Sequence, residues 1–542
     1  MPTEIETQHR PEPRTQLSRR SMLKAAGITL GSVSLMSLLQ ACGADEAGED
    51  GEGNLTLRMP FLQDMQVPDP DIMYEGEGVQ VMQACYDGLV TYKSGTSEII
   101  PQLADSWTVS DDQLTYTFKL KPDVTFHDGT PADAEAWVKS FKRRAAVEQG
   151  PAYMVTGMEK AEAKDATTLV IKLKEPNNAF LHYAACPWKM LVTSPTAVNK
   201  NAVGGDLAQT WLKTHDAGTG PYVMKEFVPG SHYVLERFDG YWGEQPYFKT
   251  IRIQITPEIA TQKLQLDQGA FHLVSHGFAI ADVLSYKKDK KFSVATNLGA
   301  SMMSLYMNPG AGMFKDKSLR QAMMTAIDRA TAVETSFQGL TTVQENFWPE
   351  NMFPKGLAPF DPKVDLGPLT EKVARLSNKK IDFAWVSSNG APAQQMAELI
   401  QTQLAPTGLE ITIRAMPSAE WFDLCNQPAD KRPDLLLASM GGDALHLDTA
   451  LRIFLRTGAK PLNAFQYGNP KVDALMDEAI TKGTEDKTND VYLQITDIIA
   501  DEALWVPLCR IPQNFVTHSA ISGIELDSYL PYIFNPAKIK RV

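Results

Sequence analysis

The 542-residue sequence lacks the short motifs that mark the common classes of enzyme. It contains no Gly-x-Ser-x-Gly nucleophile turn, no His-Glu-x-x-His zinc motif and no glycine-rich phosphate-binding loop. Ser285 and Lys288 satisfy Ser-x-x-Lys, but no Lys-Thr-Gly accompanies them. We therefore expect a protein that is not an enzyme and that needs neither a metal nor another cofactor.

Cysteine is scarce, with five residues in the whole chain, and none of them shows Cys-x-x-Cys or another metal-ligand spacing. The four after Cys42 stand in apolar contexts, which favours buried free thiols. Disulfide bridges stay open as an alternative, because an exported protein permits them. These four residues are Cys85, Cys186, Cys425 and Cys509.

Positive charge is in deficit, since 52 lysines and arginines against 65 aspartates and glutamates give a formal net charge of -13. This balance argues against a nucleic-acid partner and against adhesion to anionic lipid by charge. The content of 43% hydrophobic and 22% charged residues is typical of a soluble globular protein, which we expect to be a monomer. A mature chain of roughly 500 residues exceeds one hydrophobic core, so two or three domains are expected.

Long apolar runs are missing too, apart from a diluted one in SRRSMLKAAGITLGSVSLMSLLQACG, residues 18–43. Its glycines, serines and threonine lower the apolar content below that of a membrane-spanning helix. A basic front, a modest apolar middle and a small-residue end are typical of a secretory signal. Arg19 and Arg20 resemble the twin-arginine export motif, with Met22 where Phe is usual.

The end of this run, Leu39-Gln40-Ala41-Cys42, resembles the lipobox of bacterial lipoproteins. The resemblance implies removal of the signal peptide 1–41 and lipid attachment to Cys42. Gln40 is a less usual residue there, so cleavage by another peptidase remains an alternative. Residues 42–53 are acidic and glycine-rich and predict a flexible tether. We expect a lipid anchor that holds the protein outside the cytoplasm, in the periplasm or on the outer face of the cytoplasmic membrane.

Hydrophobic periodicity predicts secondary structure over much of the rest of the chain. Alternation of apolar and polar residues predicts strands over 114–121, 168–176 and 251–256. A helix should begin at Thr130-Pro131, with proline at its first position. A helical stripe of apolar residues predicts one continuous helix over 316–333.

Residues 380–448 alternate between strand and helix patterns. Strands are predicted for 380–386, 409–415 and 433–440, with helices over 391–408 and 418–426 between them. Such alternation implies parallel pairing with right-handed crossovers, and hence a doubly wound layer.

Ligands of such layers bind at the loops that follow the strands. Ser388 and Asn389 precede a helix amino terminus that favours an anion, whereas the loop 441–448 offers Asp443, His446 and Asp448 for a cationic or hydrogen-bonding group.

Three blocks of sequence resemble family 5 of the extracytoplasmic solute-binding proteins, the oligopeptide and dipeptide type that serves ABC importers. The first is residues 86–143, which include FHDGTP, and the second is residues 218–269, from Gly-Thr-Gly-Pro-Tyr through Tyr-Trp-Gly. The third is residues 305–334. Together the blocks and the segments between them span residues 86–334, about half of the mature chain.

The resemblance implies an α/β fold of the two-lobed periplasmic-binding-protein type, with an extra inserted domain and mixed sheets flanked by helices. Domain I would comprise 54–85, 183–300 and 510–542, domain II 86–182, and domain III 301–509. Two connections between domains I and III would form a hinge. A solute enclosed between these domains would favour the closed form, which the membrane permease recognises.

The resemblance also suggests ligand contacts. In peptide-binding relatives an aspartate after the buried domain III strand pairs with the ligand's amino terminus, and Asp443 holds that position. Met440 stands near where a tryptophan is common, and Asn308 matches a recurrent asparagine whose role can be structural. The alternative for Asp443 is a cap of the next helix, and the alternative for His446 is an ordinary hydrogen-bonded loop histidine.

A peptide or peptide-like solute is therefore the expected ligand, and an ABC permease the expected membrane partner. The alternatives are a receptor of this fold for a metal chelate, haem or an oligosaccharide, or a sensor. An exported enzyme is a further alternative, because the twin-arginine route often carries cofactor-loaded proteins.

Overall fold

The computed structural model describes residues 55–542 except 276, 351, 353, 461, 483, 484, 528, 531 and 532. The predicted signal with Arg19 and Arg20, the tether and Cys42 lie outside these residues. In the described part, none of the helices has the length and apolar character needed to cross a bilayer. Its four cysteines are buried free thiols, as the apolar contexts favoured.

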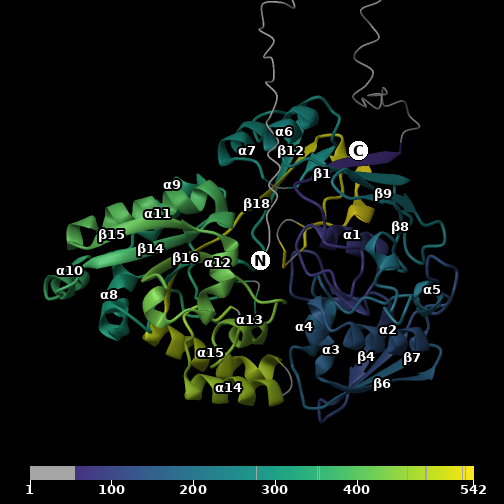
Figure 1. The fold of residues 1–542 in the computed structure, drawn as a ribbon, viewed down its shortest axis with the longest axis horizontal. Coiled ribbons are helices and arrows are strands. Elements are labelled where there is room, and N and C mark those ends of the chain that lie inside the picture. The colour runs from purple at the N-terminus through teal and green to yellow at the C-terminus, as the bar shows by residue number, and fades with distance from the viewer. Residues whose placement is uncertain are drawn as a thin grey trace, which may run out of the picture. The chain divides into compact units, whose positions relative to one another are not determined.

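In each of two sheets, strands that are far apart in sequence lie side by side (Figure 1). In the first sheet β1 pairs parallel with β10, and the other neighbours are antiparallel. The predicted strand over 251–256 is confirmed as β10. The first sheet has the order β1 (Thr56–Phe61), β10 (Thr250–Ile255), β9 (His232–Arg237), β8 (Tyr222–Val228). The second has the order β11 (Leu273–Val274), β18 (Gln513–His518), β12 (Phe292–Asn297).

A four-stranded antiparallel sheet is formed by residues that lie between β1 and β8 in sequence, and helix α2 (Ala134–Val147) packs on it. The predicted strands over 114–121 and 168–176 are confirmed as its two central strands. The order is β4 (Ala104–Val109), β5 (Thr115–Leu120), β7 (Thr168–Leu173), β6 (Met158–Asp165). The neighbouring short elements are α1 (Gly78–Cys85), β2 (Val90–Tyr92), β3 (Ile99–Pro101), α3 (Tyr153–Thr156), α4 (Phe180–Ala185) and α5 (Pro195–Asn201).

Helix α2 begins three residues later than the sequence suggested. Asp133 has an extended backbone and its side chain accepts a hydrogen bond from the Ala136 N–H, so it is the N-cap. Pro131 pairs instead with Thr125 in an isolated bridge. The prediction of proline at the first helical position was wrong, because the aspartate supplied a better cap.

The largest sheet has five strands, and its first part matches the predicted doubly wound pattern. Strands β15, β14 and β16 are parallel, whereas β13 and β17 add an antiparallel pair, so the whole sheet is mixed. Helix α11 (Gly390–Leu404) lies on β14 and β15. The order is β15 (Glu410–Met416), β14 (Lys380–Val386), β16 (Leu435–Met440), β13 (Met302–Met307), β17 (Trp505–Arg510).

The segment 316–333 forms two helices instead of one. Helix α8 (Lys317–Ala326) ends before Ile327, which is extended, and α9 (Arg329–Phe337) starts after Asp328. The Asp328 carboxylate accepts a hydrogen bond from the Thr331 N–H and caps the second helix. This local cap outweighs the continuous apolar stripe, so the single-helix prediction was wrong.

The remaining helices and strands lie around these sheets (Figure 1). The predicted helix over 418–426 is α12 (Ser418–Asp423), followed by a 3₁₀ turn. The others are α6 (Ile259–Asp267), α7 (Ile280–Tyr286), α10 (Gly367–Ala374), α13 (Leu447–Phe454), α14 (Pro470–Thr481), α15 (Glu485–Glu502), β19 (Ile521–Ser522) and β20 (Lys540–Arg541).

Two short segments connect the three-stranded sheet with the five-stranded sheet. Residues 298–301 lead from β12 to β13, and residues 511–512 lead from β17 to β18. The Ile511 N–H donates to the Ser301 carbonyl across 3.4 Å, so the two connections lie side by side. Adjacent short crossovers of this kind are suited to act as a hinge.

The FHDGTP block has a structural role in this fold. His127 Nδ1 contacts the Asp216 carboxylate, and Nε2 lies 2.9 Å from the Gly220 carbonyl. Burial would lower the pKa of His127, but the charge of Asp216 and the hydrogen bonds to Asp216 and Gly220 together raise it. A Cβ atom at Gly218 would lie 1.9 Å from the Cys85 carbonyl oxygen, so only glycine fits there.

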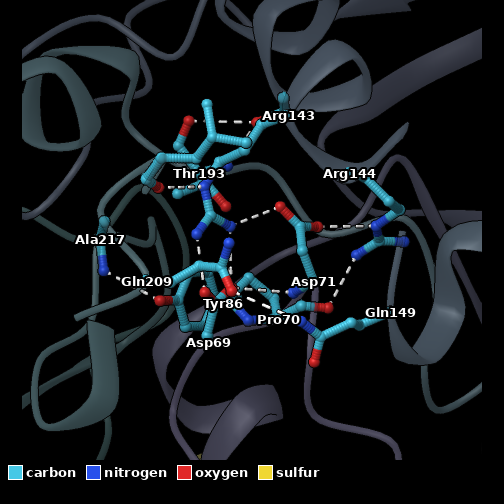
Figure 2. Close-up of polar contacts among 12 residues, drawn as sticks. Asp69, Pro70, Asp71, Tyr86, Arg143, Arg144, Gln149, Thr193, Gln209 and Ala217 are labelled. Atoms are coloured by element: carbon cyan, nitrogen blue, oxygen red, sulfur yellow. Dashed lines mark hydrogen bonds and ion pairs between the residues drawn. The ribbon is translucent and has the colours of Figure 1, made fainter. Parts of the chain in front are cut away.

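A buried network of ion pairs fixes the loop after β1 to helix α2 (Figure 2). Arg143 binds Asp69 with both terminal nitrogens, at 2.8 and 2.7 Å, and reaches Asp71 at 2.6 Å. Arg144 donates to Asp71 at 2.8 Å and to the Pro70 carbonyl at 3.1 Å. Burial alone would lower the pKa of Arg143, but its hydrogen bonds to Asp69 and the two negative charges raise it. Each charge thus has a partner, which buried ions require.

We predict that Arg143→Met lowers the free energy of unfolding by about 3–5 kcal/mol, because two buried carboxylates lose a partner. The measurement is the midpoint of urea denaturation. Lys139→Met, on the exposed side of the same helix, is the matched control and should change stability by less than about 1 kcal/mol. Equal stability of the two variants would contradict the role of the network.

Candidate functional site

The parallel strands of the largest sheet end at one edge, where several predicted residues lie. Ser388 is exposed at the end of β14, and Met440 is partly buried at the end of β16. The Ser439 hydroxyl donates to Asn389 Oδ1 at 2.9 Å and joins the loops that follow these two strands. The edge therefore combines small polar groups with an apolar thioether.

Asp443 lies in the loop after β16, and two tyrosines from distant segments bind its carboxylate. The hydroxyls of Tyr74 and Tyr153 donate to Oδ2 at 2.7 and 2.6 Å. The other carboxylate oxygen, Oδ1, accepts no hydrogen bond from any described residue. Tyr74 follows β1 and Tyr153 begins α3, so the contact joins the five-stranded sheet to the segments around α2.

Aromatic rings surround this carboxylate. The rings of Tyr74 and Tyr153 meet edge to face with centroids 6.1 Å apart. Trp188 lies 5.0 Å from Tyr74, and Tyr183 lies 5.8 Å from Tyr153. We call Asp443 with Tyr74, Tyr153, Tyr183 and Trp188 the Asp443 cluster. Aromatic faces beside a carboxylate attract ammonium and other organic cations.

The electrostatics of the Asp443 cluster follow from burial. Burial raises the pKa of Asp443, while the hydrogen bonds from Tyr153 and Tyr74 lower it in part. Burial and the charge of Asp443 raise the pKa of both tyrosines, so their hydroxyls stay protonated and act as donors. A carboxylate in this state is stabilised further by any cation that reaches it.

The Asp443 carboxylate has no cationic partner within the described residues, in contrast to Asp69 and Asp448. The buried Asp87 also has no ion pair within 4 Å, but three neutral side chains, Gln102, Thr219 and Trp242, donate to it. Asp69 is paired with Arg143, and Asp448 is paired with Arg452 at 2.6 Å. No lysine, arginine or histidine nitrogen within the described residues lies within 4 Å of the Asp443 carboxylate. The negative charge of Asp443 is therefore not neutralised by a cation among the described residues, and a bound cation would neutralise it.

The ion-pair network of Figure 2 positions the two tyrosines. Asp69 and Asp71 belong to the loop that carries Tyr74, and Arg143 and Arg144 hold that loop on α2. Gly150, at φ +43°, lies so close to this loop that a Cβ atom would come within 2.5 Å of the Ile72 carbonyl oxygen. The turn before Tyr153 therefore packs directly on the segment before Tyr74, and the tyrosines are placed together.

Three other predicted residues have internal partners, and one of them, Asp448, is paired with Arg452. Asn308 is fully buried, donates to the Ala429 carbonyl at 3.0 Å and accepts from the Gly310 N–H. His446 is the N-cap of α13, where Nδ1 accepts from the Asp448 N–H at 3.3 Å.

The alternative of Asp443 as a helix cap is thus wrong, because His446 occupies the N-cap position. Burial and the nearby His182 hold the pKa of His446 well below its usual value, so its ring is neutral.

Further contacts accompany the Asp443 cluster on the same side of the five-stranded sheet. The Leu445 N–H donates to the Tyr92 hydroxyl at 3.1 Å, and the rings of His182 and His446 lie 4.9 Å apart. Asn178 donates to the Ala479 carbonyl at 3.2 Å. The loop 441–446 and the end of α14 therefore both contact the segments around α2 and α4.

The described residues contain no group of three or more histidine, cysteine, aspartate or glutamate side chains placed to hold a metal ion. The arrangement offers hydrogen bonding, aromatic contact and one negative charge, which are the means of binding a solute.

Comparison with protein families places this geometry in context. Residues 98–461 match the model of the bacterial extracellular solute-binding proteins, family 5 middle region. A probable D,D-dipeptide-binding periplasmic protein of Escherichia coli is 25% identical over 87% of this chain and 92% of its own length. Heme-binding protein A of Haemophilus influenzae is 26% identical over 81% of this chain and 84% of its own length.

Solved structures agree on the fold. The periplasmic binding protein DppA of Helicobacter pylori, in complex with the peptide STSA, superposes with a TM-score of 0.74 at 21% identity. The match covers 90% of this chain and 98% of that protein. The fold is therefore the mixed α/β fold of the peptide-receptor type of periplasmic binding proteins.

We predict that the double variant Tyr74→Phe, Tyr153→Phe loses about 1–3 kcal/mol of unfolding free energy at pH 7, because the ionised Asp443 loses both donors. The loss should shrink as the pH falls below the raised pKa of Asp443, where the protonated carboxyl needs the donors less. Denaturation at several pH values measures it, with Tyr247→Phe at an exposed tyrosine as the control. A loss that does not vary with pH would contradict the contact with the carboxylate.

Proposed function

This chain belongs to family 5 of the bacterial extracellular solute-binding proteins, and from that premise we propose that it captures a peptide or peptide-like solute with a free amino group. The solute is enclosed between two lobes and delivered to the membrane permease of an ABC importer. The names of its relatives support this class, since they include a dipeptide-binding protein and a receptor crystallised with a peptide.

The observation that carries the proposal is the Asp443 carboxylate without a cation of its own. An amino terminus brings a positive charge and N–H donors to Oδ1, which accepts no hydrogen bond from the described residues. The surrounding aromatic rings add cation–π attraction. Ser388, Asn389 and Met440 lie at the same edge of the sheet and are proposed to contact the rest of the solute. Asn308, His446 and Asp448 support the site through their internal contacts.

The three sheet regions are proposed to be three domains, with the boundaries expected from the sequence. Domain I comprises 54–85, 183–300 and 510–542, domain II 86–182 and domain III 301–509. The connections 298–301 and 511–512 serve as the hinge between domains I and III. The solute stabilises the closed form because only that form contacts it from both sides, and this closed form is what the permease recognises.

The cell biology follows from the amino-terminal sequence. The protein is proposed to be exported by the twin-arginine route, cleaved before Cys42 and lipidated there, and to act as a monomer outside the cytoplasm. It performs no chemistry on its solute, in keeping with the absence of enzyme motifs.

We predict that Asp443→Asn weakens binding of an ammonium-bearing tripeptide at least tenfold at pH 7, because the amide carries no charge. The same variant should not lower the melting temperature, since the Asn oxygen still accepts from Tyr74 and Tyr153 and no charge remains to be desolvated. Calorimetric titration and thermal denaturation measure the two effects. Asp361→Asn, at an exposed aspartate, is the control. Unchanged affinity would remove Asp443 from the site, and binding of sugars or metal chelates alone would remove the peptide class.

We also predict a pH dependence of affinity. Burial raises the pKa of Asp443 in the free protein, so protonation competes with the cationic solute at a higher pH than for an exposed aspartate. Affinity should fall by up to about tenfold for each pH unit below that pKa, while the solute's ammonium group stays charged. Titrations between about pH 4 and pH 7 test this. A slope that persists in Asp443→Asn would assign the effect to another group.

A further inference from the structure

A mostly apolar cavity lies inside the part of the chain that contains the five-stranded sheet. Its cavity volume is about 60 Å³, and it is partly open to solvent. Strands β13 and β17 form one side, and helix α13 with the segment 462–467 forms the other. Its lining includes Met302, Tyr306, Trp348, Met440, Phe454 and Trp505.

The lining is adaptable and includes the unpaired indole N–H of Trp505. Methionine side chains such as Met302 and Met440 adjust their shape to different apolar groups. Trp505 is 3% exposed, and its indole N–H has no acceptor within hydrogen-bond distance among the described residues. Most buried donors in native proteins are paired, and a backbone carbonyl of a bound peptide that reaches the cavity would satisfy this one, while the apolar side chain contacts the methionines.

The cavity lies next to the Asp443 cluster along the chain. Met440 and Gly441 line it, and only three residues separate Met440 from Asp443. Their Cα atoms are therefore at most about 11 Å apart. An extended peptide advances by a similar amount over three residues, so a solute held by its amino terminus at Asp443 can place an early side chain in the cavity.

We propose that this cavity binds a large apolar side chain from one of the first three residues of the solute. The solute class is therefore a short peptide that has a free amino terminus and a leucine-sized or larger apolar side chain close to it. This inference rests on the proposed function, because the amino terminus is positioned by Asp443. The cavity thus supplies the side-chain preference, and the carboxylate supplies the charge recognition.

The test is calorimetric titration with three tripeptide series, Xaa-Ala-Ala, Ala-Xaa-Ala and Ala-Ala-Xaa, in which Xaa is Ala, Asn, Leu or Phe. At one of the three positions, Leu or Phe should bind at least tenfold tighter than Asn or Ala, because each buried methylene contributes roughly fourfold. Asn is the polar residue closest in size to Leu, so the comparison separates apolar character from bulk.

A cavity-filling variant links that preference to the cavity. Ala464 is buried and lines the cavity, and Ala464→Leu should reduce the ratio of Leu to Ala affinities below threefold. Ala374→Leu, at an exposed position of α10, is the matched control and should keep the ratio. Leu462→Phe, on the more exposed side of the lining, replaces Ala464→Leu if the latter lowers the melting temperature strongly.

The outcomes separate this inference from the proposed function. If Ala-Ala-Ala and the Asn peptides bind as tightly as the Leu and Phe peptides, the inference is overturned and the proposed function stands. If no tripeptide binds at all, the peptide function fails and the inference fails with it. A preference for Leu that survives in Ala464→Leu would place the apolar side chain elsewhere and also overturn the inference.

Discussion

The candidate site depends on a carboxylate that the fold holds among aromatic rings and leaves without a cation. Asp69 and Asp448 are each paired with an arginine, and the buried Asp87 accepts from three neutral donors, whereas Asp443 has only two tyrosine hydroxyls as donors among the described residues. Two tyrosine hydroxyls are a weaker compensation, because they carry no charge. In the proposed function a positively charged solute supplies the missing cation, and the attraction between that charge and the Asp443 carboxylate contributes to binding.

That arrangement needs rigid support from distant parts of the chain. Tyr74 comes from the loop after β1 and Tyr153 from the start of α3, a helix of only four residues, so both side chains depend on neighbouring segments for their position. The ion pairs of Arg143 and Arg144 with Asp69 and Asp71 hold the loop on α2 (Figure 2). Buried charges are expensive unless fully paired, and full pairing gives the loop one defined position. The network therefore contributes to function through geometry, at a distance from the solute.

Local signals in the sequence predicted much of the fold. The strands β5, β7, β10, β14 and β16 and the helix α11 follow from periodicity and from turn residues such as Gly408, whose φ of +82° ends the helical segment. The start of α2 and the break between α8 and α9 were predicted wrongly. In each case one capping carboxylate, Asp133 or Asp328, determined where the helix begins, in spite of a proline signal or an apolar stripe. Strand β13 is antiparallel to β16, and β17 is antiparallel to β13. Tertiary packing determines this pairing, and no local sequence pattern predicts it.

The site was only partly predictable. Asp443 was found because it follows a buried strand in a sequence block that resembles a family motif. Tyr74 and Tyr153 were not found, since they are 79 residues apart and each is more than 280 residues from Asp443 in sequence. Nothing in their neighbourhoods distinguishes them from surface tyrosines. His446 and Asp448 were predicted as ligand contacts because they lie in a polar loop. In the structure His446 caps helix α13, and Asp448 is paired with Arg452.

The most direct measurement is a crystal structure of the mature protein with a bound solute, either retained through purification or added as a tripeptide. The account predicts a solute amino nitrogen at about 2.7–3.2 Å from the Asp443 carboxylate, with the rings of Tyr74 and Trp188 beside it. A solute bound between the domains with no cationic group near Asp443 would contradict it.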